Sequence, residues 1–334
     1  MTRNSHLIKI ILAFTAIYLI WGTTYLGIRV AIDTIPPFLM VGARFIIAGL
    51  PLFMFLRLRG RPMPRLAHWR SAFLVGGFLL VGGNGFVTWA EQEVPSGIAA
   101  LIVATVPLWM TVFDWILFKA SRPGRRIAFG VILGLVGVAL LIGPQLLDAN
   151  GGVSLGSWAI MILAPLLWSI GSLLSRSADL PDDLFMSISI EMLAGGVLLS
   201  LIGLALGEAN QLHLAQISPR SWAAFFYLII FGSLIAFTAY IWLLQNVQAT
   251  RVGTYSYVNP VIAVFLGWLI LDEPLSGRMI VAAAVIVVAV MLIIRQRGGG
   301  HQTQEEAATE PEPTTVERPP ALQVQPISVS AESD

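Results

Sequence analysis

Charged side chains inside long apolar segments are the residues of this sequence most able to do chemistry. Arg44 and Glu191 each stand about seven residues inside such a segment. A charge in the interior of a bilayer is costly, so it is a functional candidate by default. Two roles follow from these residue types, namely substrate binding and proton coupling. A structural ion pair that locks two helices together is the competing interpretation, and the residues alone leave both open.

The partners of these two charges can be predicted from their depths. Arg44 and Glu191 are equivalent under an offset of 147 residues, which puts them at mirrored depths if the two halves of the chain are inverted. The helical rise then separates them by roughly 10 Å in height, so a direct pair is not expected. Residues of similar depth are better partners. We therefore expect Arg44 beside Glu91 near the outer end, and Glu191 beside Arg176 near the inner end.

Two prolines stand about eleven residues inside apolar segments. Pro107 closes VPSGIAALIVATVP and Pro260 closes VQATRVGTYSYVNP. At about 1.5 Å per residue, each lies roughly 16 Å from the start of its helix, near the middle of the hydrocarbon layer. Proline frees the carbonyl four residues earlier, and a freed carbonyl is tolerated where protein or a wet cavity covers it. A matched pair of breaks predicts moving helices that line a binding site; a simple kink is the alternative.

Aromatic and neutral hydrogen-bonding side chains recur in the same segments. They suit the wall of a path for an amphipathic or zwitterionic solute with an apolar body, although packing alone also accounts for aromatics in membrane helices. The predicted path residues are Trp21, Thr24, Asn84, Trp168, Ser172, Tyr240, Thr254, Tyr255 and Asn259.

The composition sets the class of protein that must position these residues. The 334 residues are 56% hydrophobic and 12% charged, which is typical of a polytopic membrane protein. No cysteine is present, the four histidines are scattered, and neither HExxH nor GxxxxGK[ST] occurs. These absences argue against an intramembrane enzyme, a metal site and an ATP motor. The basic residues form no patch for nucleic acid.

Ten apolar segments are long enough to span a bilayer, and the chain is predicted to be all-α. They cover residues 9–30, 37–56, 69–90, 96–118, 126–143, 155–175, 184–206, 219–244, 250–271 and 276–294. Lys and Arg concentrate in every second connection, so both termini are predicted to be cytoplasmic. The polar stretch 295–334 cannot bury a core and is predicted to be a disordered, dispensable tail.

The chain also repeats itself. At an offset of 147, Trp21 meets Trp168; at an offset of 153, Pro107 meets Pro260. Each copy holds five spans, an odd number, so the second copy must be inverted. We therefore expect two inverted five-helix repeats, residues 9–143 and 155–294, around a central cavity.

Several stretches resemble the drug/metabolite transporter superfamily, and within it the EamA-type exporters, YedA-type bacterial inner-membrane proteins in particular. They are IWGTTYLGIRVAIDTIPPF, ARFIIAG, GNGFVTWAEQEVPSGIAALIVATVP, IEMLAGG and SYVNPVIAVFLG. The resemblance covers about residues 10–294. It implies ten helices in two inverted repeats, and export of small metabolites, amino-acid-like compounds or drugs.

The resulting prediction is a secondary exporter that works by alternating access in the bacterial inner membrane. Its expected partners are the lipid bilayer and a small-molecule substrate, with no nucleic acid. No cofactor is expected, although coupling to a proton or another ion gradient is possible. A passive channel is the alternative, which saturation and counterflow would exclude.

Overall fold

The structure is a computed structural model that describes residues 3–118, 122, 124–147, 152–247 and 252–292. Within these ranges every regular element is a helix. Seven helices are long and apolar enough to cross a membrane, and Val258–Leu271 and Gly277–Leu292 are shorter apolar ones. The predicted tail 295–334 lies outside the described residues.

Four of these seven helices have no interruption, namely α1 (Arg3–Ala31), α2 (Pro37–Leu58), α8 (Leu155–Ser175) and α9 (Leu184–Ala205). The helix α7 (Arg125–Leu147) is also uninterrupted but is not one of the seven. They are followed by α13 (Tyr255–Leu271) and by the helix Gly277–Leu292.

Three spans are composite. The third joins α3 (Leu66–Gly76), the π-helix η1 (Gly77–Gly85) and α4 (Phe86–Ala90). The fourth joins α5 (Ser96–Val103) and α6 (Val106–Leu117). The eighth joins α10 (Pro219–Tyr227), the π-helix η4 (Leu228–Phe237) and α11 (Thr238–Asn246), and short 3₁₀ turns at Glu208–Asn210 and Leu214–Gln216 precede it.

Short polar side chains set several helix starts. The hydroxyl of Ser154 accepts from the Ser157 N–H at the start of α8, and Asp183 accepts from two N–H groups at the start of α9. The Ser218 hydroxyl does the same at α10, accepting from the Ser221 N–H. Such caps satisfy backbone donors that a helix leaves free at its first turn, so each helix begins at a defined residue.

The pair α2 and α9 packs backbone to backbone through glycine. A Cβ added at Gly42 would lie 3.0 Å from the Gly196 oxygen, and one added at Gly49 would lie 3.0 Å from the Ser189 oxygen. The offset of 147 carries the first contact onto the second, because residue 42 maps to 189 and 49 maps to 196. Reciprocal contacts of this kind are what a two-fold axis produces, with the axis running between the two helices.

The two π-helices form a second reciprocal set. Gly171 of α8 lies against Leu79 of η1, where a Cβ would come within 2.9 Å of the leucine Cβ. Gly232 of η4 lies against Thr24 of α1, where a Cβ would come within 3.3 Å of the threonine methyl. The offsets of 147 and 153 relate these two contacts as well, since 171 maps to 24 and 79 maps to 232. η1 and η4 therefore take equivalent places.

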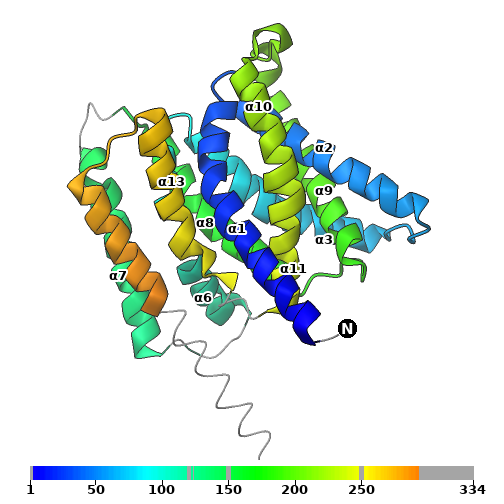
Figure 1. Ribbon diagram of the computed structural model, residues 1–334, viewed down its shortest axis with the longest axis horizontal. Helices are drawn as coiled ribbons and strands as arrows, with labels where there is room; N and C mark the ends of the chain where they lie inside the picture. The colour runs from blue at the N-terminus through cyan, green and yellow to red at the C-terminus, as the bar shows by residue number, and fades with distance from the viewer. Residues whose placement is uncertain (1–2, 119–121, 123, 148–151, 248–251, 293–334) are drawn as a thin grey trace, which may run out of the picture. The chain divides into compact units, whose positions relative to one another are not determined.

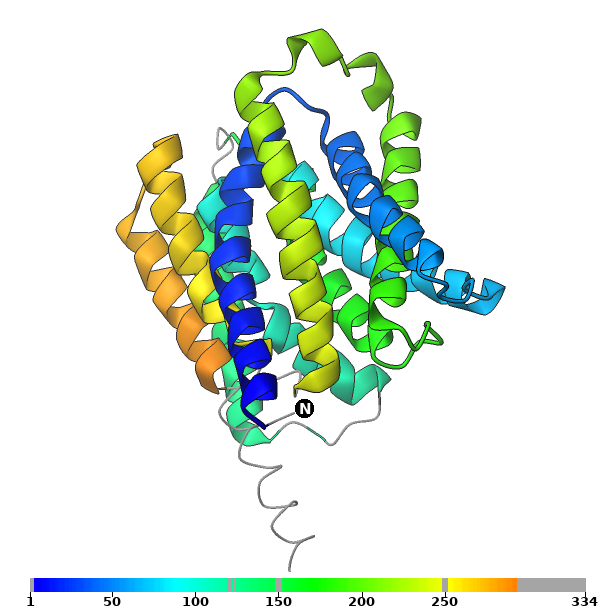
Figure 2. The same ribbon diagram turned by 45° about the vertical axis from the view of Figure 1, so that its right-hand side comes forward.

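Figures 1 and 2 show α1 beside the composite span α10–η4–α11, with α2 and α9 on one side and α13 on the other. Buried apolar side chains gather in two main clusters, one centred on α1, α2, α9 and η4, and one on α5, α8 and the helix Gly277–Leu292. Large apolar side chains such as Phe129 and Trp268 face outward, which suits a surface in contact with lipid.

Candidate functional site

A cavity of about 60 Å³ lies where α1, α2, η1, α8 and α13 meet. The space between the helices of a bundle is a common place for small-molecule sites. The residues that line it are Trp21, Thr24, Tyr25, Ile28, Arg44, Gly83, Asn84, Val87, Val103, Ala164, Pro165, Trp168 and Tyr255.

Arg44 is the charged residue in this lining, and its side chain is 2% exposed. Its Nε donates to the Ser233 hydroxyl of η4 at 2.7 Å, and its Nη1 donates to the Asn84 side-chain oxygen of η1 at 3.5 Å. Its Nη2 lies against Gly232, where an added Cβ would come within 2.8 Å. The two equivalent π-helices thus hold one cation between them, and the glycine leaves room for it.

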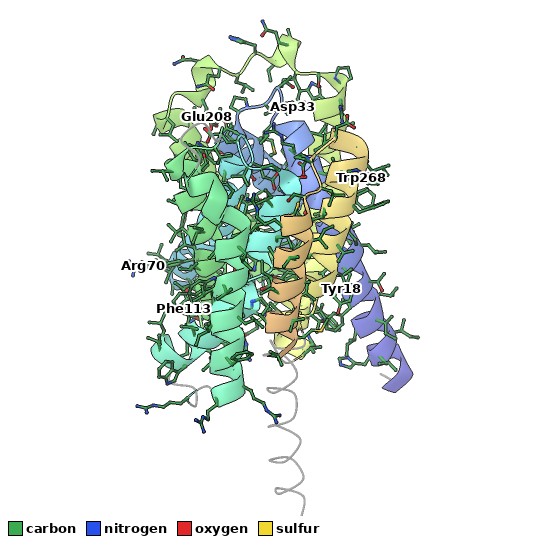
Figure 3. The ribbon with its side chains drawn as sticks, turned by 90° about the vertical axis from the view of Figure 1, so that its left-hand side faces the viewer. Tyr18, Asp33, Arg70, Phe113, Glu208 and Trp268 are labelled. Atoms are coloured by element: carbon green, nitrogen blue, oxygen red, sulfur yellow. The ribbon has the colours of Figure 1, made fainter. Side chains whose placement is uncertain are left out.

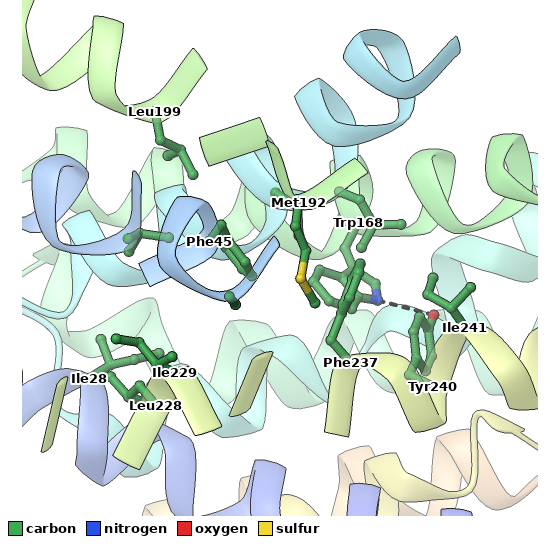
Figure 4. Close-up of a cluster of buried hydrophobic side chains, with 14 of the residues drawn as sticks. Ile28, Phe45, Trp168, Met192, Leu199, Leu228, Ile229, Phe237, Tyr240 and Ile241 are labelled. Carbon is green, nitrogen blue, oxygen red and sulfur yellow. Dashed lines mark hydrogen bonds between the residues drawn. The ribbon is translucent and has the colours of Figure 1, made fainter. Parts of the chain in front are cut away.

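Four aromatic rings pack together at the cavity, and three of them line it. Trp21 of α1 lies 5.6 Å from Trp168 of α8 and 5.4 Å from Tyr255 of α13, measured between ring centroids. Tyr240 of α11 completes the group at 4.9 Å from Trp21. Its hydroxyl accepts from the Trp168 Nε1 at 3.2 Å, as the dashed line in Figure 4 shows. Because Trp21 and Trp168 are equivalent under the offset of 147, each repeat supplies one tryptophan.

The predicted path residues divide into two groups. Those that line the cavity are Trp21, Thr24, Asn84, Trp168 and Tyr255. The others are not among the lining residues and have contacts of their own. Ser172 bonds to the Tyr240 hydroxyl at 2.8 Å, Thr254 bonds to the Tyr18 hydroxyl, and the Asn259 amide nitrogen donates to the Tyr18 carbonyl at 3.0 Å.

The two prolines have different surroundings. The fourth span is interrupted just before Pro107, because α5 ends at Val103 and α6 begins at Val106. The Ser169 hydroxyl of α8 donates to the Val106 carbonyl at 3.1 Å, which gives a polar partner to this irregular backbone. Pro260 lies within α13, which is helical on both sides of it, so no interruption of the helix accompanies this proline, and its role as a hinge stays a prediction.

The predicted contact between Arg44 and Glu91 is wrong in this structure. Arg44 bonds to Ser233 and Asn84, while both carboxylate oxygens of Glu91 are buried without a hydrogen-bond partner among the described residues. Arg29 donates instead to the backbone carbonyl of Glu91. The prediction fails because shared depth does not fix which way two side chains on separate helices point.

The predicted contact between Glu191 and Arg176 is also wrong. Glu191 is 1% exposed, accepts from the Ser187 hydroxyl at 3.3 Å, and leaves its Oε2 without a partner among the described residues. Arg176 caps the end of α8 and is exposed. Glu191 is therefore an unpaired buried carboxyl group, and its predicted alternative role, binding a coupling proton, stays open.

Carboxylates in the connections form contacts that no sequence motif predicts. Glu273 accepts from the Ser96 N–H at 2.7 Å and the Gly97 N–H at 3.0 Å, at the start of α5. Glu208 accepts from the Phe38 and Leu39 N–H groups at 3.1 and 2.8 Å, at the start of α2. Each carboxylate joins the second half of the chain to a helix start in the first half, where the helix dipole favours negative charge.

A third carboxylate contact lies at the start of α8. Glu93 accepts from the Ser154 N–H at 2.7 Å. This hydrogen bond, together with one from Ser157, lowers the pKa of Glu93. Burial instead raises the pKa of Glu208, against the opposing effect of its two N–H donors. All three contacts occur at the end of the bundle that the charge pattern predicts to face outward, where Figure 3 places Glu208 and Asp33.

The family profile described as the EamA-like transporter family matches residues 7–143 and again 156–295. The chain belongs to the EamA-like transporter family. No group of three or more His, Asp or Glu side chains that could hold a metal ion is found in the part of the chain that the structure describes.

Two relatives illustrate the similarity of this EamA-like chain to named transporters. It is 40% identical to the uncharacterized inner membrane transporter YedA of Escherichia coli (strain K12), over 82% of this chain and 87% of the relative. It is 26% identical to the uncharacterized transporter YoaV of Bacillus subtilis (strain 168), over 82% and 93%. A solved crystal structure matches with a TM-score of 0.61 at 24% identity, over 85% of this chain and 96% of that one, which shows the fold alone.

Proposed function

We propose that this EamA-like protein is a secondary transporter that exports small amphipathic solutes across the bacterial inner membrane by alternating access. The observation that carries the proposal is the central cavity, to which both halves of the chain contribute equivalent residues, Trp21 and Trp168. A site on a pseudo-two-fold axis can be exposed to either side when the two halves exchange conformations.

The reciprocal glycine contacts support the inverted arrangement of two five-helix repeats. Gly42 and Gly49 of α2 meet equivalent partners on α9 in opposite order along the helix. In our proposal residues 9–143 and 155–294 are the two repeats, and both termini are cytoplasmic. The names of the relatives support the membrane and the transport class, and the solute and direction are part of the proposal.

Counterflow into proteoliposomes tests the proposal. Vesicles that hold the purified protein and an unlabelled amphipathic acid should accumulate the labelled acid transiently. A carrier exchanges an unlabelled molecule from inside for a labelled molecule from outside in each cycle. A passive channel would show no such overshoot and no saturation. If the labelled acid enters the vesicles neither with an overshoot nor by passive entry, the protein does not transport this class of solute.

A matched pair of variants ties the activity to the cavity. Val103 lines the cavity, whereas Val281 is 56% exposed on the outer surface of the helix bundle. Val103→Trp is expected to fill the cavity and lower counterflow at least about tenfold, while Val281→Trp should retain the wild-type rate. Equal rates in the two variants would move the transport path away from the cavity.

A further inference from the structure

The guanidinium of Arg44 is a buried cation without a counter-charge in the described part of the chain. Its hydrogen-bond partners, Ser233 and Asn84, are neutral, and none of the ion pairs among the described residues includes it. The ring centroid of Phe45 lies 5.0 Å from the Arg44 Cζ, and this ring carries no charge. Burying an uncompensated charge is expensive, so this cation is held for a partner that the protein itself does not supply.

The guanidinium also has donors to spare. Arginine carries five N–H donors, and here only Nε and one donor of Nη1 have partners among the described residues. The donors without a partner are one on Nη1 and two on Nη2, and a guanidinium can present such donors in pairs to the two oxygens of a carboxylate. Gly232 lies against Nη2, where a side chain would collide with the guanidinium. The contacts on η1 and η4 therefore hold Arg44 in one orientation.

Much of the rest of the cavity wall is apolar and aromatic. Trp21, Trp168 and Tyr255 supply aromatic rings, and Val103 and Ala164 also line the cavity. The lining contains no Asp or Glu that could pair with an ammonium group. A cation together with aromatic rings in one lining suits a solute with one negative group and an apolar body.

We propose that Arg44 binds the carboxylate of the transported solute and that the cavity selects organic monoanions over neutral, zwitterionic and cationic analogues of the same body. This inference rests on the proposed transport function and adds the charge class of the solute. Asn84 and Ser233 act as positioning residues, because they orient the guanidinium from the two π-helices.

Four probes that share a phenylalkyl body and differ in charge state test the inference on the wild-type protein. The probes are 3-phenylpropionate, 3-phenylpropanamide, phenylalanine and phenethylammonium, and binding is read as the rise in unfolding temperature of the purified full-length chain. We expect the propionate to bind at least about tenfold more tightly than the amide. Equal or tighter binding of any other probe would overturn the proposal, and cation–π capture of an ammonium group by the rings would appear in this way.

Variants then place the anion at Arg44. Arg44→Gln should weaken propionate binding about ten- to hundredfold and leave binding of the amide unchanged, while Arg44→Lys should restore part of the affinity. The exposed Arg70→Gln is the matched control for a lost positive charge. If Arg44→Gln does not fold, Gly232→Ala keeps the charge and crowds Nη2, and it should weaken the propionate selectively. Selectivity for the propionate that survives in the folded variant would overturn the assignment.

The outcome can be separated from that of the transport proposal. If a neutral or zwitterionic solute shows counterflow and the propionate does not bind, the transport proposal stands and the proposed anion site is wrong. Binding of the propionate that depends on Arg44 without counterflow would leave the anion site and contradict the transport function.

Discussion

At the scale of single residues, the unpaired buried charges are the most informative feature. Arg44 and Glu191 occupy equivalent positions, yet their environments differ. Arg44 lines the cavity, whereas Glu191 of α9 accepts, among the described residues, only from Ser187 on its own helix. A lone carboxyl group in an apolar span is expensive as an anion, so protonation removes most of that cost. We therefore propose separate tasks for the two residues, solute binding and proton exchange.

The task of Glu191 can be tested by neutralising it. Glu191→Gln should fold with wild-type stability or better, because it removes a charge whose Oε2 has no partner among the described residues. Uphill export driven by a pH gradient should disappear, while counterflow without a gradient continues. Both activities are measured in proteoliposomes, with Ser187→Ala as the control for the lost hydrogen bond. An unchanged pH dependence of export in Glu191→Gln would contradict the proposed task.

Glu93 should give the protein a small acid sensitivity. Its pKa is lowered because the Ser154 N–H and Ser157 bind the carboxylate form. Stability from such a group is fully present above its unfolded pKa, about 4.3, and is lost as the pH falls through its folded pKa. Glu93→Gln should therefore reduce the fall in unfolding temperature between about pH 5 and 3. The effect should be small because Glu93 is exposed.

At the scale of elements, helix starts and helix interruptions are the features that can move. Glu208 and Glu273 each bind the N–H groups that begin a helix of the other half, α2 and α5. These contacts join the two halves of the chain at one end of the bundle. If the two halves separate there in an outward-open state, these hydrogen bonds must lengthen. We therefore infer that they stabilise the closed state of the predicted outer end.

Loss of the Glu273 contact should favour opening at that end. Glu273→Gln keeps the size of the side chain but loses the charge that the helix start favours, and Ser96→Ala removes the hydroxyl donor alone. The chain has no cysteine, so single cysteines can be introduced on each face and labelled with a membrane-impermeant reagent. Labelling at the predicted outer end should rise about twofold or more in Glu273→Gln and less in Ser96→Ala. Equal labelling of all three proteins would show that the contact does not hold the end closed.

The two prolines should respond differently to replacement. Pro107 follows a real interruption of the fourth span, so Pro107→Ala would allow α5 and α6 to join into one helix and should lower transport relative to folded protein. Pro260 lies inside a continuous α13, so Pro260→Ala should gain stability at less cost to transport. Both rates are measured by counterflow and divided by the amount of folded protein. Equal losses in the two variants would restore the paired hinge that the sequence suggested.

At the scale of the whole molecule, the two segments that match the family profile, residues 7–143 and 156–295, meet along α2 and α9, and both line one cavity. Small residues allow that approach, since a Cβ at Gly49 would lie 2.9 Å from the Met192 Cβ. Many large apolar side chains are exposed on the helices, and the polar stretch 295–334 is predicted to take no part in the bundle.

Removal of that stretch tests the last point. A chain ending at Arg297 should reach the same unfolding temperature and the same counterflow rate as the full chain, because the stretch has no apolar periodicity with which to pack. Both are measured on protein purified in the same detergent. A drop in unfolding temperature of several degrees would assign the tail a structural role.

The class of membrane protein, several of its spanning helices, the family and much of the aromatic cavity wall could be predicted from the sequence. Long apolar runs, charges in alternate connections and a repeat of Trp21 at Trp168 are properties of the chain read one residue after another. The partners of the polar side chains could not be predicted in this way. The bonds from Arg44 to Ser233 and Asn84 join three spans, and Glu273 reaches α5 across the chain. Such contacts depend on the rotation of each helix about its axis, which apolar length does not encode and which packing at residues such as Gly42 and Gly232 sets.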